Sequence, residues 1–441
     1  GWTHNFVQSA DHALALDVKL AMMKNRYVAS AIDPQWQLDH ASPFMGFTFA
    51  DMEFVVDDKD FPVNQQLVDN WISNTGQRTP FLNRTDLRST QEFRLNPWGV
   101  ATGFYLSGLG GDFTNTREDQ LQARVSVDWQ ANRYNRFKFG GDWTNIDLAA
   151  ALLPWTTQNF GEVWVENPTR MSAYVQDRID LGDLVIEAGL RYDRFDPKSR
   201  FPVVPGYFRP DHPEDFMDAP VQAVWSPRLG VSFPVTENST FRLSYGHFAQ
   251  VPDLNEYYQG KNLEYFTYKI TNTNDYFARP LEMGKTIAFE FGFRQLLGPD
   301  FVLDISAYNK DKLADVALRK LPYNDPTRPG AVTWLNTFTN ADYGTIRGVD
   351  VRVDRRFGRL LDIMGGYSYQ DARGTGTDPY TYADVFARTE SSAATLLGQP
   401  TNPAQAIRPI EENRVHNISG NFVFHVPADY EEFPAWARNV A

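Results

Sequence analysis

Apolar and polar side chains alternate along most of the chain with a period of two residues. In 121–130, for example, Leu121, Val125 and Trp129 occupy one parity, and charged or polar residues occupy the other. Because successive side chains of a strand point to opposite faces, this pattern predicts strands with one apolar and one polar face. It predicts full strands at 11–23, 119–130, 136–148, 169–180, 184–195, 224–235, 239–250, 283–295, 301–311, 343–355, 360–372 and 413–427, with 1–6 as the end of an earlier strand.

The length of these strands favours a membrane barrel. Strands of globular proteins usually run about 5 or 6 residues, whereas a tilted strand needs about 9–11 residues to cross the hydrocarbon of a bilayer. Most of the predicted strands are longer than that. The longest apolar run, 148–153, is far shorter than the roughly 18 residues of a membrane-spanning helix, so the sequence predicts crossing by strands.

The connections between these strands alternate between short and long. Outer-membrane barrels have short periplasmic turns and long extracellular loops, and a soluble sandwich has no reason to separate the two so regularly. The predicted short turns are 131–135, 181–183, 236–238, 296–300 and 356–359. The predicted long loops are 24–118, 149–168, 196–223, 251–282, 312–342 and 373–412.

Aromatic residues on the apolar parity gather near both ends of the strands. Trp129 and Phe137 flank one short turn, while Trp225 and Tyr245 lie towards long loops. Two aromatic belts are typical of a barrel whose rings sit at headgroup depth. The alternative is a soluble β protein with an aromatic core. The agreement of strand length, loop asymmetry and belts favours the membrane barrel.

Composition removes several classes of function. The chain has no cysteine, which excludes disulfides, Cys-based zinc sites and thiol nucleophiles. Its net charge of −13 argues against nucleic acid as a partner, because phosphate binding needs clustered Lys and Arg. The seven histidines form no HExxH pair, and the chain has no P-loop, nucleophile elbow or dinucleotide fingerprint. We therefore expect no catalytic site, no cofactor and no metal site.

Several short motifs follow one another in a specific order. They are Gly189-Leu190-Arg191-Tyr192-Asp193, Ser226-Pro227-Arg228-Leu229-Gly230, Pro280-Leu281-Glu282 with Lys285-Thr286 and Glu290-Phe291-Gly292, and Gly344 with Arg347-Gly348-Val349-Asp350. With Trp2-Thr3-His4 and Asn96-Pro97-Trp98-Gly99, they resemble the barrel of TonB-dependent receptors, particularly the Oar-like group with a carboxypeptidase-regulatory-like segment.

This resemblance implies a fold and a function. The family's fold is an antiparallel transmembrane β-barrel of 22 strands around a plug, so residues 1–441, with about 12 full strands, are expected to be a portion of that barrel without the plug domain and the final strands. The structure is then expected to show an open, curved sheet, or a barrel completed only by residues outside 1–441, with the strands at the two ends lacking a partner on one side. The implied function is uptake of a nutrient such as an oligosaccharide, peptide or metal chelate across the outer membrane of a Gram-negative bacterium. The implied partners are outer-membrane lipid and the TonB-ExbB-ExbD complex.

Charged residues on the polar parity are the first candidate site. Those expected to face the lumen are Arg124, Arg191, Arg228, Arg242, Glu290, Asp350 and Arg352. In the functional interpretation they contact a plug or a passing substrate. In the alternative they only form cross-strand ladders that satisfy the polar interior.

Tyrosines of the loop 251–282 are the second candidate site, for substrate binding at the extracellular face. They are Tyr257, Tyr258, Tyr265, Tyr268 and Tyr276. Aromatic rings suit stacking on sugars or peptide side chains, and the alternative is that the loops pack on one another. Two acidic runs, one at 57–60 and one formed by Asp211, Glu214, Asp215 and Asp218, offer oxygen ligands for Ca²⁺ or simply form solvated loops.

Two other classes of function remain open from sequence. A structural or adhesive surface barrel, or a passive porin, has the same strands and loops without energy coupling. A soluble β-rich carbohydrate-binding module or enzyme is the third candidate.

Overall fold

The computed structural model describes residues 1–8, 12–29, 55–56, 62–63, 113–153, 162–209, 212–261, 276–358, 360–380, 407–411, 413–426 and 434. Nearly all of them belong to one sheet of 16 strands, whose pairs are antiparallel except for one short parallel pair. No helix in these ranges is long and apolar enough to cross a membrane. The fold is therefore all-β.

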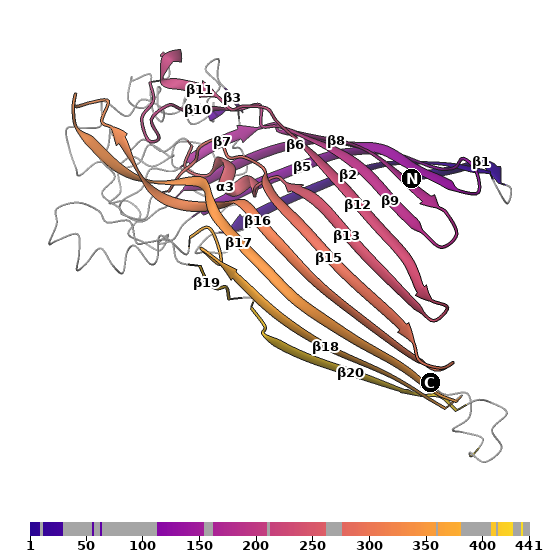
Figure 1. The fold of residues 1–441 in the computed structure, drawn as a ribbon. Coiled ribbons are helices and arrows are strands. Elements are labelled where there is room, and N and C mark those ends of the chain that lie inside the picture. The colour runs from indigo at the N-terminus through magenta and orange to yellow at the C-terminus, as the bar shows by residue number, and fades with distance from the viewer. Residues whose placement is uncertain are drawn as a thin grey trace.

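The main strands of the sheet follow the order of the chain, because each pairs with the main strand before it and the one after it (Figure 1). Its main strands are, in spatial order, β1 (Trp2–Gln8), β2 (Ala13–Ala29), β5 (Phe113–Gln130), β6 (Asn135–Leu153), β8 (Thr169–Asp180), β9 (Val185–Asp196), β12 (Gln222–Thr236), β13 (Ser239–Gln250), β15 (Gly284–Leu296), β16 (Phe301–Asn324), β17 (Val332–Phe357), β18 (Leu361–Gly374) and β20 (His416–Phe424).

Short elements extend or cover this sheet. Three of them pair with its strands: β7 (Glu162–Glu166) with β6, β14 (Tyr276–Phe277) with β17, and β19 (Arg408–Pro409) with β18. The others are two small hairpins, β10 (Arg200–Pro202) with β11 (Phe216–Asp218) and β3 (Val55–Val56) with β4 (Pro62–Val63), the helix α3 (Leu254–Tyr258) and the 3-10 turn η5 (Pro213–Asp215).

All twelve predicted strands are present, so the predicted fold class is confirmed. The predicted loops at 24–118 and 312–342 were partly wrong, because β2, β5, β16 and β17 continue well into them. β16 and β17 pair as far as Asn324 and Val332. These extensions carry polar residues on both faces, so no apolar alternation marks them.

The short turns lie at one end of the sheet and the long connections at the other (Figure 1). Three of the turns contain a glycine in the left-handed region: Gly182 with φ of 85°, Gly298 with φ of 73° and Gly358 with φ of 58°. A tight reversal needs that conformation, which costs glycine little. The end of the sheet with long connections is called the outer end below.

One face of the sheet is apolar and exposed. In one register row, Val18, Val125, Gly141, Ala173, Tyr192 and Trp225 are paired across six strands. The side chain of Trp225 is 61% exposed and that of Leu20, on the same face, 73%. A continuous exposed apolar surface of this extent is typical of contact with lipid.

The same face becomes polar towards the outer end. On β5, apolar residues at every second position from Trp129 to Leu121 give way to Asp119. On β17, Val349 is followed on that face by Arg347, which donates a hydrogen bond of 3.0 Å to Asn309 of β16. From Trp129 to Leu121 the apolar stretch has the length of strand that crosses a bilayer.

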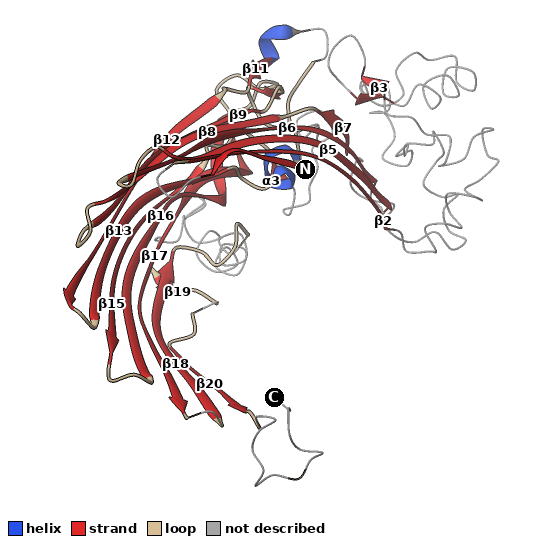
Figure 2. Ribbon diagram, turned by 90° about the vertical axis from the view of Figure 1, so that its right-hand side faces the viewer, coloured by secondary structure: helices blue, strands red, loops and turns tan. Residues whose placement is uncertain are grey.

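The opposite face lies on the concave side of the curved sheet, where α3 also lies (Figure 2). Phe195 and Ile146, on this face, are buried together with Tyr257 and Tyr258 of α3. This face and the exposed apolar one are called the concave and the convex face below.

The described sheet is open, as expected. Among the described residues β1 pairs only with β2, and β20 pairs only with β18. A barrel of 22 strands and a separate plug remain predictions.

Candidate functional site: the concave face and the outer cluster

Apolar residues at the outer end of the concave face form a buried core, called the outer cluster here. Its members are Ile146, Leu148, Ala150, Trp164, Phe195, Phe201, Tyr257, Tyr258, Ala278, Leu281, Met283, Leu318 and Phe338. The ring of Tyr257 packs on Phe195 with centroids 5.4 Å apart, and that of Tyr258 on Trp164 at 5.6 Å. The outer cluster thus joins α3 to strands β6, β7, β9, β16 and β17 of the sheet and to β10 of the small hairpin.

A single turn of helix places these tyrosines. Asp253 precedes α3, and its carboxylate accepts a hydrogen bond of 2.8 Å from the backbone N–H of Asn255. A carboxylate in this position satisfies an N–H that the helix leaves without a partner. The rings of Tyr257 and Tyr258 pack edge to face with centroids 5.0 Å apart, and both are fully buried in the outer cluster.

Two buried ion pairs hold the segments around the outer cluster. The ammonium of Lys261 pairs with Glu166 and donates a 2.8 Å hydrogen bond to the hydroxyl of Ser199. Arg319 pairs with Asp342. Each buried charge therefore has a counter-charge, which is the condition for burying it.

The structure places the five candidate tyrosines differently. Tyr257 and Tyr258 are fully buried, and the hydroxyl of Tyr258 donates to the carbonyl of Pro197 at 3.0 Å. Burial raises the pKa of both phenols well above the ordinary value. Tyr276 is partly buried against Tyr380, with centroids 5.2 Å apart. Tyr265 and Tyr268 lie outside the described residues, and a substrate-binding role for any of the five stays a prediction.

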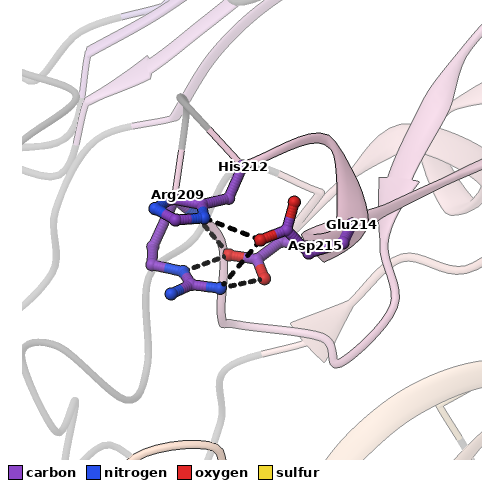
Figure 3. A network of polar contacts seen from close by, with 4 residues as sticks. All are labelled: Arg209, His212, Glu214 and Asp215. Carbon is purple, nitrogen blue, oxygen red and sulfur yellow. Dashed lines mark hydrogen bonds and ion pairs between the residues drawn. The ribbon is translucent and has the colours of Figure 1, made fainter.

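The acidic run in the loop after β10 is engaged by arginine (Figure 3). Arg209 donates two side-chain hydrogen bonds to Asp215, at 2.7 and 2.8 Å, and these hold the pKa of that carboxyl below its usual value. Glu214 contacts the imidazole Nδ1 of His212 at 2.7 Å. Asp218 lies 3.6 Å from Arg200, while Asp211 and residues 57–60 lie outside the described part. In the described ranges, no group of three or more His, Asp or Glu side chains is arranged to hold a metal ion.

A cavity of about 280 Å³, called the outer pocket here, lies beside α3. Its charged lining residues are Asp253, Glu256, Lys285, Lys312, Asp315, Asp342 and Asp378. Burial and the nearby charges of Asp253, Asp315 and Asp378 raise the pKa of Glu256 to about 7. Glu256 therefore titrates near neutral pH. Sequence reasoning missed it because two of its three acidic neighbours, Asp315 and Asp378, come from distant segments.

The candidate charges of the middle strands are spread over the concave face. Arg191 pairs with Asp193 at 2.7 Å and lies 3.8 Å from Asp142. Arg124 is paired in register with Lys19 and Asp142, on the neighbouring strands. These contacts fit the alternative of cross-strand ladders for Arg191, and do not decide its role in transport.

The three remaining charged candidates lie elsewhere along the length of their strands. Arg242 pairs with Asp304 at 2.8 Å, and Arg352 with Asp354 at 3.0 Å, both towards the short turns. Asp350 is opposite Ser306 and Ser368 in the register.

A groove of about 960 Å³ on the concave face brings four candidates together: Arg124, Arg191, Arg228 and Glu290. Arg242, Asp350 and Arg352 are not among its lining residues. The groove also contains Lys138, whose position on the polar parity places it in the lumen, and Lys310, which sequence reasoning missed. Lys310 falls next to the predicted end of its strand at 311, and the continuation of β16 to Asn324 places it in the wall.

Comparison with known proteins gives a family. The family model described as "TonB dependent receptor-like, beta-barrel" matches residues 28–406. No curated protein is significantly similar to the chain in sequence.

Three solved structures are similar to part of the chain. The FrpB iron transporter from Neisseria meningitidis is 17% identical, with 62% of this chain and 39% of that chain covered and a TM-score of 0.41. The transporter YddB from Escherichia coli is 14% identical, with coverages of 72% and 41% and a TM-score of 0.48. The siderophore receptor PiuA from Acinetobacter baumannii is 13% identical, with coverages of 84% and 46% and a TM-score of 0.42. The chain thus spans less than half the length of each of these three proteins. Because the family model covers most of its residues, the chain belongs to the TonB-dependent receptor-like β-barrel family.

Proposed function

We propose that the chain forms part of the barrel wall of a receptor that takes up a nutrient across the outer membrane of a Gram-negative bacterium. The observation that carries the proposal is the two-faced sheet. Its convex face is apolar and exposed, as contact with outer-membrane lipid requires, and its concave face holds a charged groove of about 960 Å³. A wall of this kind separates lipid from a polar path.

In this proposal the residues of the groove line the path of the substrate. Arg124, Arg191, Arg228 and Glu290 lie along the groove, with Arg242, Asp350 and Arg352 nearer the short turns. Tyr257, Tyr258 and Tyr276 belong to the outer end, where an extracellular substrate first arrives. Transport is energised by the TonB-ExbB-ExbD complex through a part of the receptor outside this chain. The substrate is an oligosaccharide, a peptide or a metal chelate, and the chain performs no enzymatic reaction.

Uptake by cells tests this proposal. A strain without the gene is compared with its parent for growth on panels of oligosaccharides, peptides and metal chelates, each as the limiting nutrient. We expect a defect on one panel, and the same defect in a strain without TonB. A defect that is independent of TonB indicates a passive porin. Wild-type growth on every panel, with loss of attachment to surfaces or partners, indicates an adhesive barrel; either outcome contradicts the proposal.

A further inference from the structure

One register row of the concave face carries three cations separated by small or uncharged residues. From β6 to β16 the row consists of Lys138, Gln176, Gly189, Arg228, Gly246, Ala288 and Lys310, each paired with the next on the neighbouring strand. All seven line the groove. Lys138, Arg228 and Lys310 are called the cation row below.

The cations of this row are exposed, and two of them have no counter-charge among the residues that the structure describes. The guanidinium of Arg228 lies 4.5 Å from the ring centroid of Phe248, and the ammonium of Lys310 lies 5.1 Å from that of Tyr308. No carboxylate of the described residues lies within 4.0 Å of either cation, including Glu187 and Glu290 in the same groove. Lys138 is 3.7 Å from Asp128, a carboxylate that Arg136 already binds at 2.7 and 2.6 Å.

Small residues leave the space around Arg228 open. Gly189 and Gly246 are its two register partners. A Cβ atom at Gly246 would lie 3.4 Å from Cγ of Arg228 and 3.3 Å from the ring of Phe248. Larger residues at these positions would fill the floor of the groove beside the guanidinium. The glycines therefore keep the guanidinium accessible from the concave side.

The residues of the row also lie at different heights along the wall, between its short-turn end and its outer end. Strands of a membrane barrel are tilted by about 35–45°, so a row perpendicular to the strands rises from one strand to the next. Lys138 is the fourth residue of β6 after its short turn, whereas Lys310 is the tenth residue of β16 after its own. Neighbouring cations are three strands apart, which is roughly 14 Å. The three cations thus stand at successive heights between the short-turn end and the outer end.

We infer that the cation row is a series of subsites for anionic groups, and that the substrate of this receptor carries carboxylates or phosphates. This inference rests on the proposed uptake function. Arg and Lys bind such groups with charge-assisted hydrogen bonds, and exposed cations without counter-ions have their donors available. Several weak sites along a path let a charged substrate enter and leave each of them. The chain as a whole is acidic, with a net charge of −13, so unpaired cations in the groove are a local departure from its average charge.

Binding of simple anions to the full-length protein in detergent tests the inference. Isothermal titration calorimetry is carried out with citrate as the carboxylate probe, inorganic pyrophosphate as the phosphate probe and maltotriose as the uncharged control. We expect the wild type to bind at least one anion, more weakly at high salt, and not to bind maltotriose. The double variant Arg228→Gln, Lys310→Gln is expected to bind the same anion about tenfold or more weakly, because it loses charge-assisted bonds.

Arg356→Gln is the matched control, since Arg356 lies on the same face, outside the groove, and pairs with Asp362 at 3.3 Å. Its anion affinity is expected to stay within about twofold of the wild type, because an occupied guanidinium offers little to a ligand. Thermal unfolding of each variant checks that it is folded. Binding of citrate alone identifies carboxylates as the ligand groups, and binding of pyrophosphate alone identifies phosphates.

Two results overturn the inference: no binding of either anion by the wild type, or equal affinities of the wild type and the double variant. If the wild type binds neither anion and the double variant unfolds at a lower temperature, another part of the receptor covers the row and the two cations contribute to stability instead. The calorimetry needs no energy coupling, so it is independent of the uptake experiment. Anion binding without TonB-dependent growth defects contradicts only the proposed function. TonB-dependent uptake without anion binding contradicts only the inference.

Discussion

The outer cluster and the membrane-spanning wall are made from the same strands, yet they bury different side chains. On β9, Phe195 is fully buried in the outer cluster, whereas Leu190, five residues away and on the convex face, is 41% exposed. On β6, Ile146 is fully buried and Phe139 is 40% exposed. The outer cluster has an interior of its own, as a soluble protein has, while the wall is a single layer that depends on lipid to cover its apolar side chains.

Cations show the same difference between the two regions. Lys261 and Arg319 are buried beside carboxylates at the outer end, and Arg228 and Lys310 are exposed without them in the groove. Paired buried charges fix the relative positions of segments, because separating them leaves a charge without solvent or partner. Exposed cations without a carboxylate partner do not hold segments together, and their donors remain available to a ligand. Stability at the outer end and binding in the wall should therefore respond to different substitutions.

The largest expected effect is at the buried pair of the outer cluster. Lys261→Met removes the ammonium that pairs with the buried carboxylate of Glu166, which should destabilise the outer cluster by about 3–5 kcal/mol. Limited proteolysis of the folded protein should then cut the outer segments at a much lower protease concentration. Lys261→Met combined with Glu166→Leu should recover most of the resistance, since both charges are removed. A single variant as resistant as the wild type would show that this pair does not hold the outer end.

The wall should respond to a charge on the convex face alone. Val127 is paired with Leu16 and Phe139 on that face, and its neighbour Ser126 faces the concave side opposite Gly140. Val127→Arg should cost about 2–4 kcal/mol if it lies near the bilayer midplane, and Ser126→Arg much less. The fraction of folded barrel in isolated membranes, read from heat-modifiable migration on gels, measures both. Equal losses for the two variants would contradict the assignment of the faces.

A pH dependence should appear at the outer end only. The pKa of Glu256 is raised from 4.5 to about 7, so the folded protein binds an extra proton between these values. The contribution of Glu256 to the free energy of unfolding is then fully present below pH of about 4.5. This contribution, on the order of 1–3 kcal/mol after screening by solvent, is lost as the pH rises through 7. Resistance of the outer segments to proteolysis should be higher at pH 5 than at pH 8, and Glu256→Gln should keep the higher value at both.

Glu237→Gln, in a short turn at the far end of the sheet, is the control for this measurement. It should leave the pH profile of the wild type unchanged. A profile that persists in Glu256→Gln would assign the titration to another group.

The wall could be predicted from the sequence far better than the outer cluster. Lipid on one side and a polar interior on the other impose a two-residue period, and that period alone located strands such as β8 and β13 to the residue. Arg124, Arg191, Arg228 and Glu290 could be placed on one face for the same reason.

The outer cluster depends on contacts between distant segments, which no local period records. Glu166 and Lys261 are 95 residues apart, and nothing near either residue indicates the other. Tyr257 and Tyr258 were candidates for exposed stacking surfaces because aromatic residues in a long loop have no periodic context. Their burial follows from packing against Phe195 and Trp164, which belong to other segments.

The smallest expected effect compares one tyrosine of each region. The hydroxyl of Tyr258 donates to the carbonyl of Pro197 inside the outer cluster, and Tyr258→Phe removes this bond and leaves that carbonyl without this donor. A loss of about 1 kcal/mol is expected, because a buried hydrogen bond contributes that much on average. Tyr192 lies on the convex face of the wall, packed against Trp225 with centroids 4.8 Å apart, so Tyr192→Phe keeps its ring contact. Urea titration followed by proteolysis of the outer segments should show a lower midpoint for Tyr258→Phe and an unchanged one for Tyr192→Phe. If both midpoints stay at the wild-type value, the hydroxyl of Tyr258 adds nothing to the outer cluster, and ring packing alone holds α3 against the sheet.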